Sequence, residues 1–74
     1  MKKKLLNYLK ENVSDDEIAY AWDRLDEMRC PLAMADRELY DKLMGLIDDF
    51  AFDNGVDIDD IYDNYDIEEL FKDL

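Results

Sequence analysis

The sequence predicts an all-α fold, a small helical bundle of three main helices followed by one or two short C-terminal helices. Apolar residues recur at intervals of three and four along most of the chain, which is the pattern of amphipathic helices. Residues that favour helix starts and helix ends stand at the borders of these stretches. Strands are poorly supported, because the chain has two valines, no threonine and no alternating run beside a hairpin turn.

Two helices are expected before Pro31. The first has one apolar side, made of Leu5, Leu6, Leu9 and Val13. Ser14 then opens a second helix, and Glu17 three residues later completes a capping box. The apolar stripe of this second helix consists of Ile18, Ala21, Trp22, Leu25 and Met28. Pro31 either ends the helix or forces the chain to turn just before it, because the residue before a proline is pushed away from helical geometry.

A third helix is expected to begin near Asp36 or slightly earlier and to run to about Asn54. Its buried face consists of Leu39, Leu43, Leu46, Ile47 and Phe50. Gly55 stands just past the C-terminus, where a left-handed conformation is often required. Gly45 lies inside the helix and costs about 1 kcal/mol relative to alanine. We expect it to permit the close approach of another helix.

After Gly55 the chain contains two similar segments with a period of nine residues. Each begins with an aspartate suited to an N-cap, Asp57 in the first and Asp66 in the second, followed by two acidic residues in the first turn. Acidic side chains at that end complement the helix dipole. The pattern predicts either two short helices in tandem or one helix that is capped again at Asp66.

Negative charge is concentrated in the last third of what we expect to be a single helical domain, residues 1–74. Residues 1–47 carry ten acidic and eight basic side chains and form a nearly neutral scaffold. Residues 48–74 carry eleven acidic side chains against Lys72 alone. A net charge of −12 repels phosphate and anionic lipid, so we expect no direct binding to nucleic acid or membranes. A positively charged protein is the expected partner.

The residue inventory argues against an enzyme. Histidine is absent and Ser14 is committed to a cap, so no Ser–His or Cys–His pair is available. Gly45 and Gly55 form no phosphate-binding loop, and zinc would need more than one cysteine or a histidine. We therefore expect no catalytic residue, no cofactor and no metal. The lone Cys30 indicates a reducing, cytoplasmic location and is expected to be a small buried apolar residue.

The candidate partner-binding residues are carboxylates and aromatics of the acidic segment. Neighbours three or four apart on a helix are separated by about 5–6 Å, which is comparable with the spacing of phosphates along a nucleic acid. An exposed aromatic such as Phe52 either covers a neighbouring segment or anchors an interface. The predicted set is Asp57, Asp59, Asp60, Asp63, Asp66, Glu68, Glu69, Phe52, Tyr62 and Tyr65.

In general character the chain is similar to the small acidic DNA-mimic proteins of phages and mobile elements, such as anti-restriction and anti-CRISPR inhibitors. The resemblance rests on composition and charge placement and includes no residue motif. It implies an inhibitor that occupies the basic groove of a nucleic-acid-binding protein. Two alternatives are an adaptor with an apolar groove for a partner helix, and a self-associating accessory domain whose acidity serves solubility only.

Overall fold

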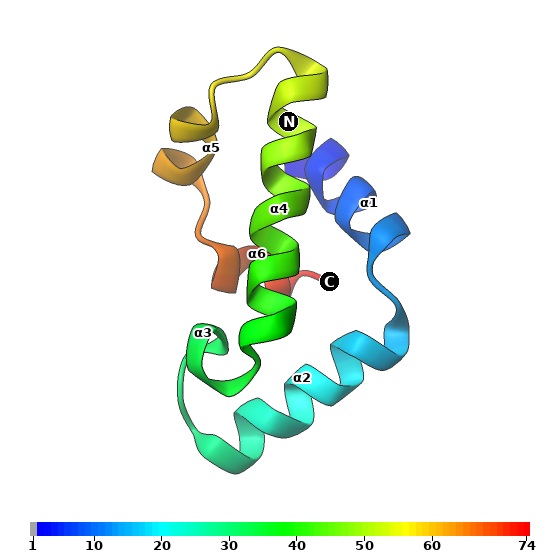
Figure 1. The fold of residues 1–74 in the computed structure, drawn as a ribbon, viewed down its shortest axis with the longest axis vertical. Helices are drawn as coiled ribbons and strands as arrows, with labels where there is room; N and C mark the ends of the chain where they lie inside the picture. The colour runs from blue at the N-terminus through cyan, green and yellow to red at the C-terminus, as the bar shows by residue number, and fades with distance from the viewer. Residues whose placement is uncertain (1) are drawn as a thin grey trace.

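The computed structural model describes residues 2–74 and confirms the all-α prediction, since these residues form helices and no strand (Figure 1). Four helices have seven or more residues. Two shorter ones, α3 and α6, complete the fold. In chain order the helices are α1 (Lys2–Asn12), α2 (Asp15–Met28), α3 (Leu32–Ala35), α4 (Arg37–Asn54), α5 (Ile58–Asn64) and α6 (Ile67–Lys72).

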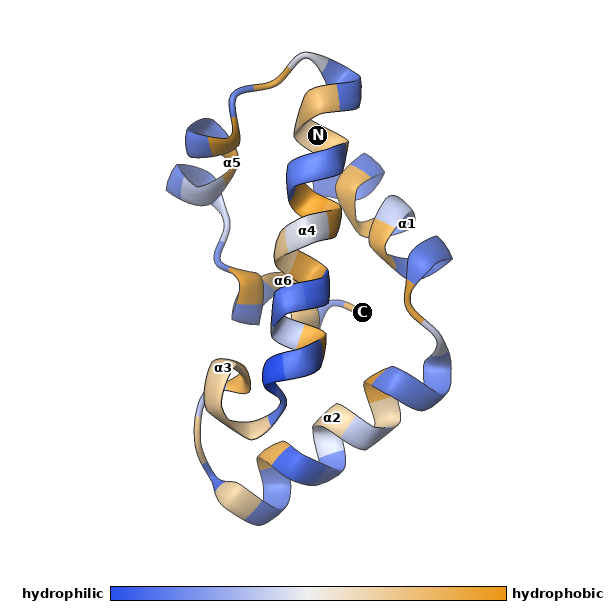
Figure 2. Cartoon of the chain, viewed as in Figure 1, coloured by the Kyte–Doolittle hydropathy of each residue, from blue (hydrophilic) through white to orange (hydrophobic). Residues whose placement is uncertain are grey.

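Helix α4 is the central element of the fold. Helices α1, α3, α5 and α6 all pack against it, whereas α2 crosses one end of the molecule and packs mainly on α3 (Figure 1). Hydrophobic residues of α1 and α5 lie on the sides of those helices that face α4 (Figure 2). The largest fully buried side chains are Phe71, Leu5, Leu9, Leu32, Leu43, Ile47, Ile61 and Leu70. The core is therefore assembled around α4 from both ends of the chain.

Most helix borders lie where the sequence predicts them. The Glu17 amide donates to Ser14 Oγ at 3.2 Å and the Ser14 amide donates to Glu17 Oε1 at 3.5 Å, which confirms the capping box. Asp36 caps α4 by accepting from the Leu39 amide. Asp57 caps α5 in the same way, whereas Asp66 stands at the start of α6 without a side-chain hydrogen bond. Both short C-terminal helices are present.

The predicted stripe of α2 is only partly buried. Ala21 is fully buried, and Ile18 and Leu25 are half-buried against the core. Trp22 and Met28 were expected on the same buried face, yet Trp22 is 43% exposed and Met28 is similarly open. The expectation is wrong for these two because α2 packs on the very short α3, which covers only part of the stripe. Cys30 is half-buried rather than buried.

Helix α3 was not predicted, because its stabilising contact comes from the far end of the chain. Its first residue, Leu32, is 1% exposed, and the Leu32 amide donates to Glu68 Oε1 at 2.9 Å. The four first amides of a helix lack partners within the helix, so an acceptor from another segment stabilises this end. A carboxylate of α6 therefore caps a helix that begins 36 residues earlier.

The expectation for Gly45 is wrong, because a Cβ added there would have no neighbour within 4 Å. We therefore expect Gly45→Ala to raise the free energy of unfolding by about 0.5–1 kcal/mol, the usual helix-propensity gain. Gly55→Ala is the matched control and should lower the free energy of unfolding, because Gly55 has a φ of 65° in the left-handed region. Urea denaturation of both variants measures the difference. A loss of stability in Gly45→Ala would contradict the prediction.

Candidate functional site

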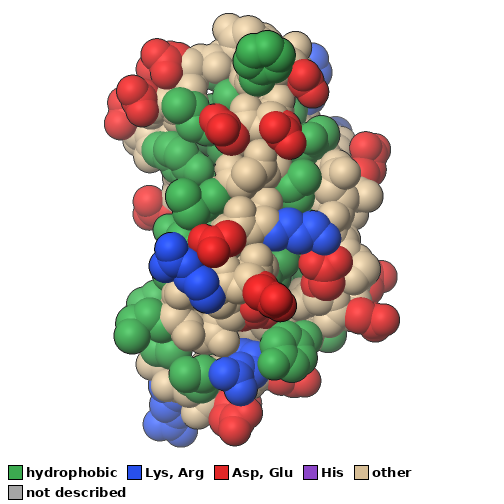
Figure 3. Space-filling model, viewed as in Figure 1, with side chains coloured by type: hydrophobic (Ala, Val, Ile, Leu, Met, Phe, Trp, Pro, Cys, Tyr) green, Lys and Arg blue, Asp and Glu red, His purple; other side chains and the backbone are tan. Residues whose placement is uncertain are grey.

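The most acidic surface of the molecule is formed by the second half of α4 together with α5. Residues 55–57 connect these two helices, and α5 packs beside α4. Acidic side chains gather over α5, at the upper left of Figure 3. The exposed carboxylates of this surface, named here the acidic end, belong to Asp48, Asp49, Asp53, Asp57, Asp59, Asp60 and Asp63.

The charge of the acidic end is not compensated within the part of the chain that the structure describes. The ion pairs among residues 2–74 join Lys2 to Glu69 and Asp73, Arg37 to Asp41, and Lys42 to Glu17. None of these carboxylates belongs to the acidic end. The aspartates of this surface therefore repel one another, and binding of a cationic partner would relieve this repulsion.

Two aromatic side chains stand beside these carboxylates. Phe52 is 87% exposed, so the interpretation that it covers a neighbouring segment is wrong. Tyr62 is 36% exposed. The pKa of its hydroxyl is raised above the ordinary value, first by burial and then by Tyr40 and the negative charge of Asp48. Tyr40 and Asp48 both belong to α4, against which α5 packs, so Tyr62 stands at the α4–α5 junction.

The predicted partner-binding residues separate into two groups. In the first group, Asp59, Asp60, Asp63 and Tyr62 lie on α5, Asp57 is the N-cap of that helix, and Phe52 lies near the end of α4. The structure brings Asp48, Asp49 and Asp53 of α4 into the same surface, although they were absent from the predicted set. The predicted helix end at Gly55 could have indicated them, because a reversal there returns α5 alongside α4.

The remaining predicted residues lie on or near α6, and all of them except Asp66 contact other parts of the fold. Glu68 is half-buried and caps α3. Lys2 Nζ lies 3.9 Å from Glu69 Oε1 and 6.0 Å from the centre of the half-buried Tyr65 ring. Asp66 is exposed. The contacts of Glu68, Glu69 and Tyr65 join the α6 region to α1 and α3, which is a structural role that the sequence pattern did not reveal.

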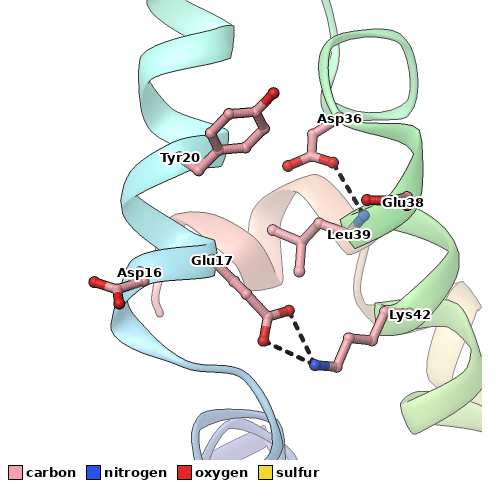
Figure 4. A pocket seen from close by; sticks show the side chains of 7 residues that line it. All are labelled: Asp16, Glu17, Tyr20, Asp36, Glu38, Leu39 and Lys42. Atoms are coloured by element: carbon pink, nitrogen blue, oxygen red, sulfur yellow. Dashed lines mark hydrogen bonds and ion pairs between the residues drawn. The ribbon is translucent and has the colours of Figure 1, made fainter.

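A hollow of about 470 Å³ lies between α2 and α4 (Figure 4). Both oxygens of Glu17 lie 2.9 Å from Lys42 Nζ, and this hydrogen-bonded pair lowers the pKa of Glu17. Asp36 accepts from the Leu39 amide at the start of α4, on one side of the hollow, and Tyr20 of α2 lines the other side. Two of the four carboxylates here are therefore engaged in holding the ends of α2 and α4 in place.

Residues 2–74 contain no group of three or more acidic, cysteine or histidine side chains placed to hold a metal ion. No helix in this part of the chain combines the length and the apolar character needed to cross a membrane. Fold and surface together define a small all-helical domain with one strongly acidic end. The sequence matches no family model, and neither a curated protein nor a solved structure matches it.

Proposed function

We propose that the protein is a non-enzymatic protein-binding domain whose acidic end occupies the nucleic-acid-binding surface of a positively charged partner. The observation that carries the proposal is the cluster of seven exposed aspartates without an ion-pair partner among the described residues. Charge needed only for solubility has no reason to be concentrated on two adjoining helices. The proposed role is that of a nucleic-acid-mimicking inhibitor, as in phages or mobile elements.

Electrostatics supports this role at two ranges. The net charge of −12 attracts a basic surface from a distance and raises the association rate. At close range the aspartates of α4 and α5 stand at helical intervals of about 5–6 Å, comparable with the spacing of phosphates. A groove lined by lysine and arginine can therefore pair with this surface as it pairs with a nucleic-acid backbone.

The exposed aromatics supply the affinity that charge alone does not provide. Phe52 is 87% exposed, and burying a phenylalanine side chain contributes about 1.5–3 kcal/mol. Aromatic side chains are also enriched among the residues that dominate binding energy. Phe52 and Tyr62 therefore serve as anchors, while the aspartates guide the encounter and select a basic partner. Glu68 and Glu69 contribute less, because the fold already engages them.

The test combines capture with displacement of nucleic acid. The immobilised protein is mixed with nuclease-treated bacterial lysate at low and at high salt, and captured proteins are identified by mass spectrometry. A captured protein is then bound to labelled DNA, and displacement of the DNA by the free domain is followed by fluorescence anisotropy. We expect salt-sensitive capture of nucleic-acid-binding proteins and competitive displacement, since exposed charges are screened by salt.

Two variants of equal net charge separate the acidic end from acidity in general. The first replaces Asp53, Asp59, Asp60 and Asp63 with asparagine, and the second replaces Glu11, Asp23, Asp26 and Glu27 with their amides. The first should displace DNA about tenfold less well or worse, within the range of electrostatic steering, and the second should resemble the wild type. Equal losses in both, or no capture of nucleic-acid-binding proteins, would refute the proposal.

If the protein instead self-associates through Phe52, measurements of its oligomeric state would show it. An apolar interface responds weakly to ionic strength, so sedimentation velocity would show a dimer at low and high salt alike. Phe52→Ala would then yield a monomer. In the proposed function, Phe52→Ala stays folded and monomeric like the wild type but displaces DNA less effectively.

A further inference from the structure

A second surface, distant in sequence from the acidic end, is an apolar groove between α2, the turn that follows it and α6. Its volume is about 370 Å³, and its apolar lining includes Trp22, Leu25, Pro31 and Phe71. The ring centres of Trp22 and Phe71 lie 4.9 Å apart. Phe71 is buried beneath Trp22, which is itself 43% exposed. The groove therefore presents the chain's single tryptophan to solvent.

The groove is bordered by positive charge, which is unusual for this chain. Arg29 and Lys72 both line it, and neither takes part in an ion pair or a side-chain hydrogen bond among residues 2–74. The other basic residues without such a contact in this part of the chain are Lys3, Lys4 and Lys10 of α1. The one acidic residue of the lining, Glu68, is held by the Leu32 amide. Arg29 at the end of α2 and Lys72 at the end of α6 therefore lie beside the exposed Trp22, and neither has an ion-pair partner among residues 2–74.

Arg29 also occupies a backbone position that disfavours it. It ends α2 with a φ of 52° and is the one non-glycine residue with positive φ in the described chain. Glycine is the usual residue there, because a side chain strains the left-handed conformation. The chain therefore carries an arginine at a position where glycine would be more stable, and this arginine lines the groove.

We propose that this groove binds a short peptide segment in which one acidic residue adjoins a large apolar residue. The apolar side chain packs on Trp22, and the carboxylate pairs with Arg29 and Lys72. A single carboxylate matches the lining, because Arg29 and Lys72 exceed Glu68 by one charge. A polyanion or a second copy of this chain is disfavoured, because the net charge of −12 repels both.

This inference goes beyond the proposed function, because it involves residues outside the acidic end and a ligand of opposite charge. It can hold or fail whether or not the acidic end binds a basic protein. A protein with both surfaces would join two partners of different charge.

The test uses the fluorescence of Trp22, the chain's single tryptophan. The full protein is titrated with the blocked peptide acetyl-Gly-Phe-Asp-Gly-amide and with its Phe-Asn and Ser-Asp analogues. We expect the Trp22 fluorescence to change saturably with the Phe-Asp peptide. Each analogue should bind about tenfold more weakly or worse, because a hydrogen bond to a charged group or a buried phenyl ring is worth at least that much. No saturable change, or equal binding of the Phe-Asn analogue, would overturn the proposal. Equally tight binding of 3-phenylpropionate would assign the groove to small molecules instead.

Arg29→Gly distinguishes a binding residue from a structural one. It should weaken binding of the Phe-Asp peptide about tenfold. It should also raise the midpoint of thermal unfolding by about 4–8 °C, because glycine relieves the strain of the left-handed conformation. Lys72→Gln should also weaken binding. Lys10→Gln removes the same charge from an exposed position of α1 and should leave binding unchanged. Equal weakening by Lys10→Gln, or unchanged binding in Arg29→Gly, would refute the role of the cationic border.

Discussion

Replacing Phe71 with alanine is expected to unfold most of the molecules, although this residue lies in a helix of only six residues. Phe71 is 1% exposed and belongs to the same core cluster as Leu43 and Ile47 of α4. Truncating a buried phenylalanine costs about 3–5 kcal/mol, because apolar contacts are lost and a cavity remains. A single core of this size rarely supplies more than about 3–5 kcal/mol of net stability. The expected loss is therefore as large as the whole net stability of the domain, which is why most molecules should be unfolded.

Circular dichroism during urea denaturation measures this effect. Phe52→Ala is the matched control, because it makes the same chemical change at a side chain that is 87% exposed. Its free energy of unfolding should change by no more than about 0.5 kcal/mol, as for other surface substitutions. If Phe71→Ala were as stable as Phe52→Ala, α6 would not be part of the core in solution.

The second large effect is expected from Glu68→Ala, which removes the carboxylate that caps α3. The Leu32 amide would lose its 2.9 Å hydrogen bond at a half-buried site. Hydrogen bonds to charged groups contribute about 1.5–3 kcal/mol, and loss of a helix cap costs about 0.5–2 kcal/mol. We therefore expect a loss of about 1–3 kcal/mol in the free energy of unfolding. Glu68→Gln keeps an acceptor oxygen and should lose less.

Asp66→Ala is the control for this prediction. Asp66 stands at the start of α6, but its side chain makes no capping hydrogen bond. A change of no more than about 0.5 kcal/mol is expected. Equal losses in Glu68→Ala and Asp66→Ala would show that the cap on α3 does not contribute. Glu68 is also unsuitable for charge reversal in a binding experiment, because Glu68→Lys would alter the fold together with the charge.

The sequence determined the helices wherever the controlling interactions are local. The capping box of Ser14, the cap of Asp36 and the left-handed Gly55 each involve residues within a few positions of one another. The same holds for Asp57, which caps α5, the first of the two similar segments after Gly55. Helical periodicity is likewise local, and it predicted the buried face of α4. Of the five predicted residues, Leu46 is half-buried and the other four, Leu39, Leu43, Ile47 and Phe50, are buried. The concentration of charge in residues 48–74 follows from the sequence alone.

Tertiary structure alone decided which residues of these helices are covered and which remain available. Periodicity places Trp22 on an apolar stripe, but only the packing of α2 on the short α3 leaves its ring open. The acidic residues of α5 and α6 look alike in sequence, yet Glu68 caps α3 while the aspartates of α5 are free of ion pairs within residues 2–74. Caps and periodicity act within one or two turns, whereas burial and pairing depend on segments tens of residues away, and only the folded chain brings these together.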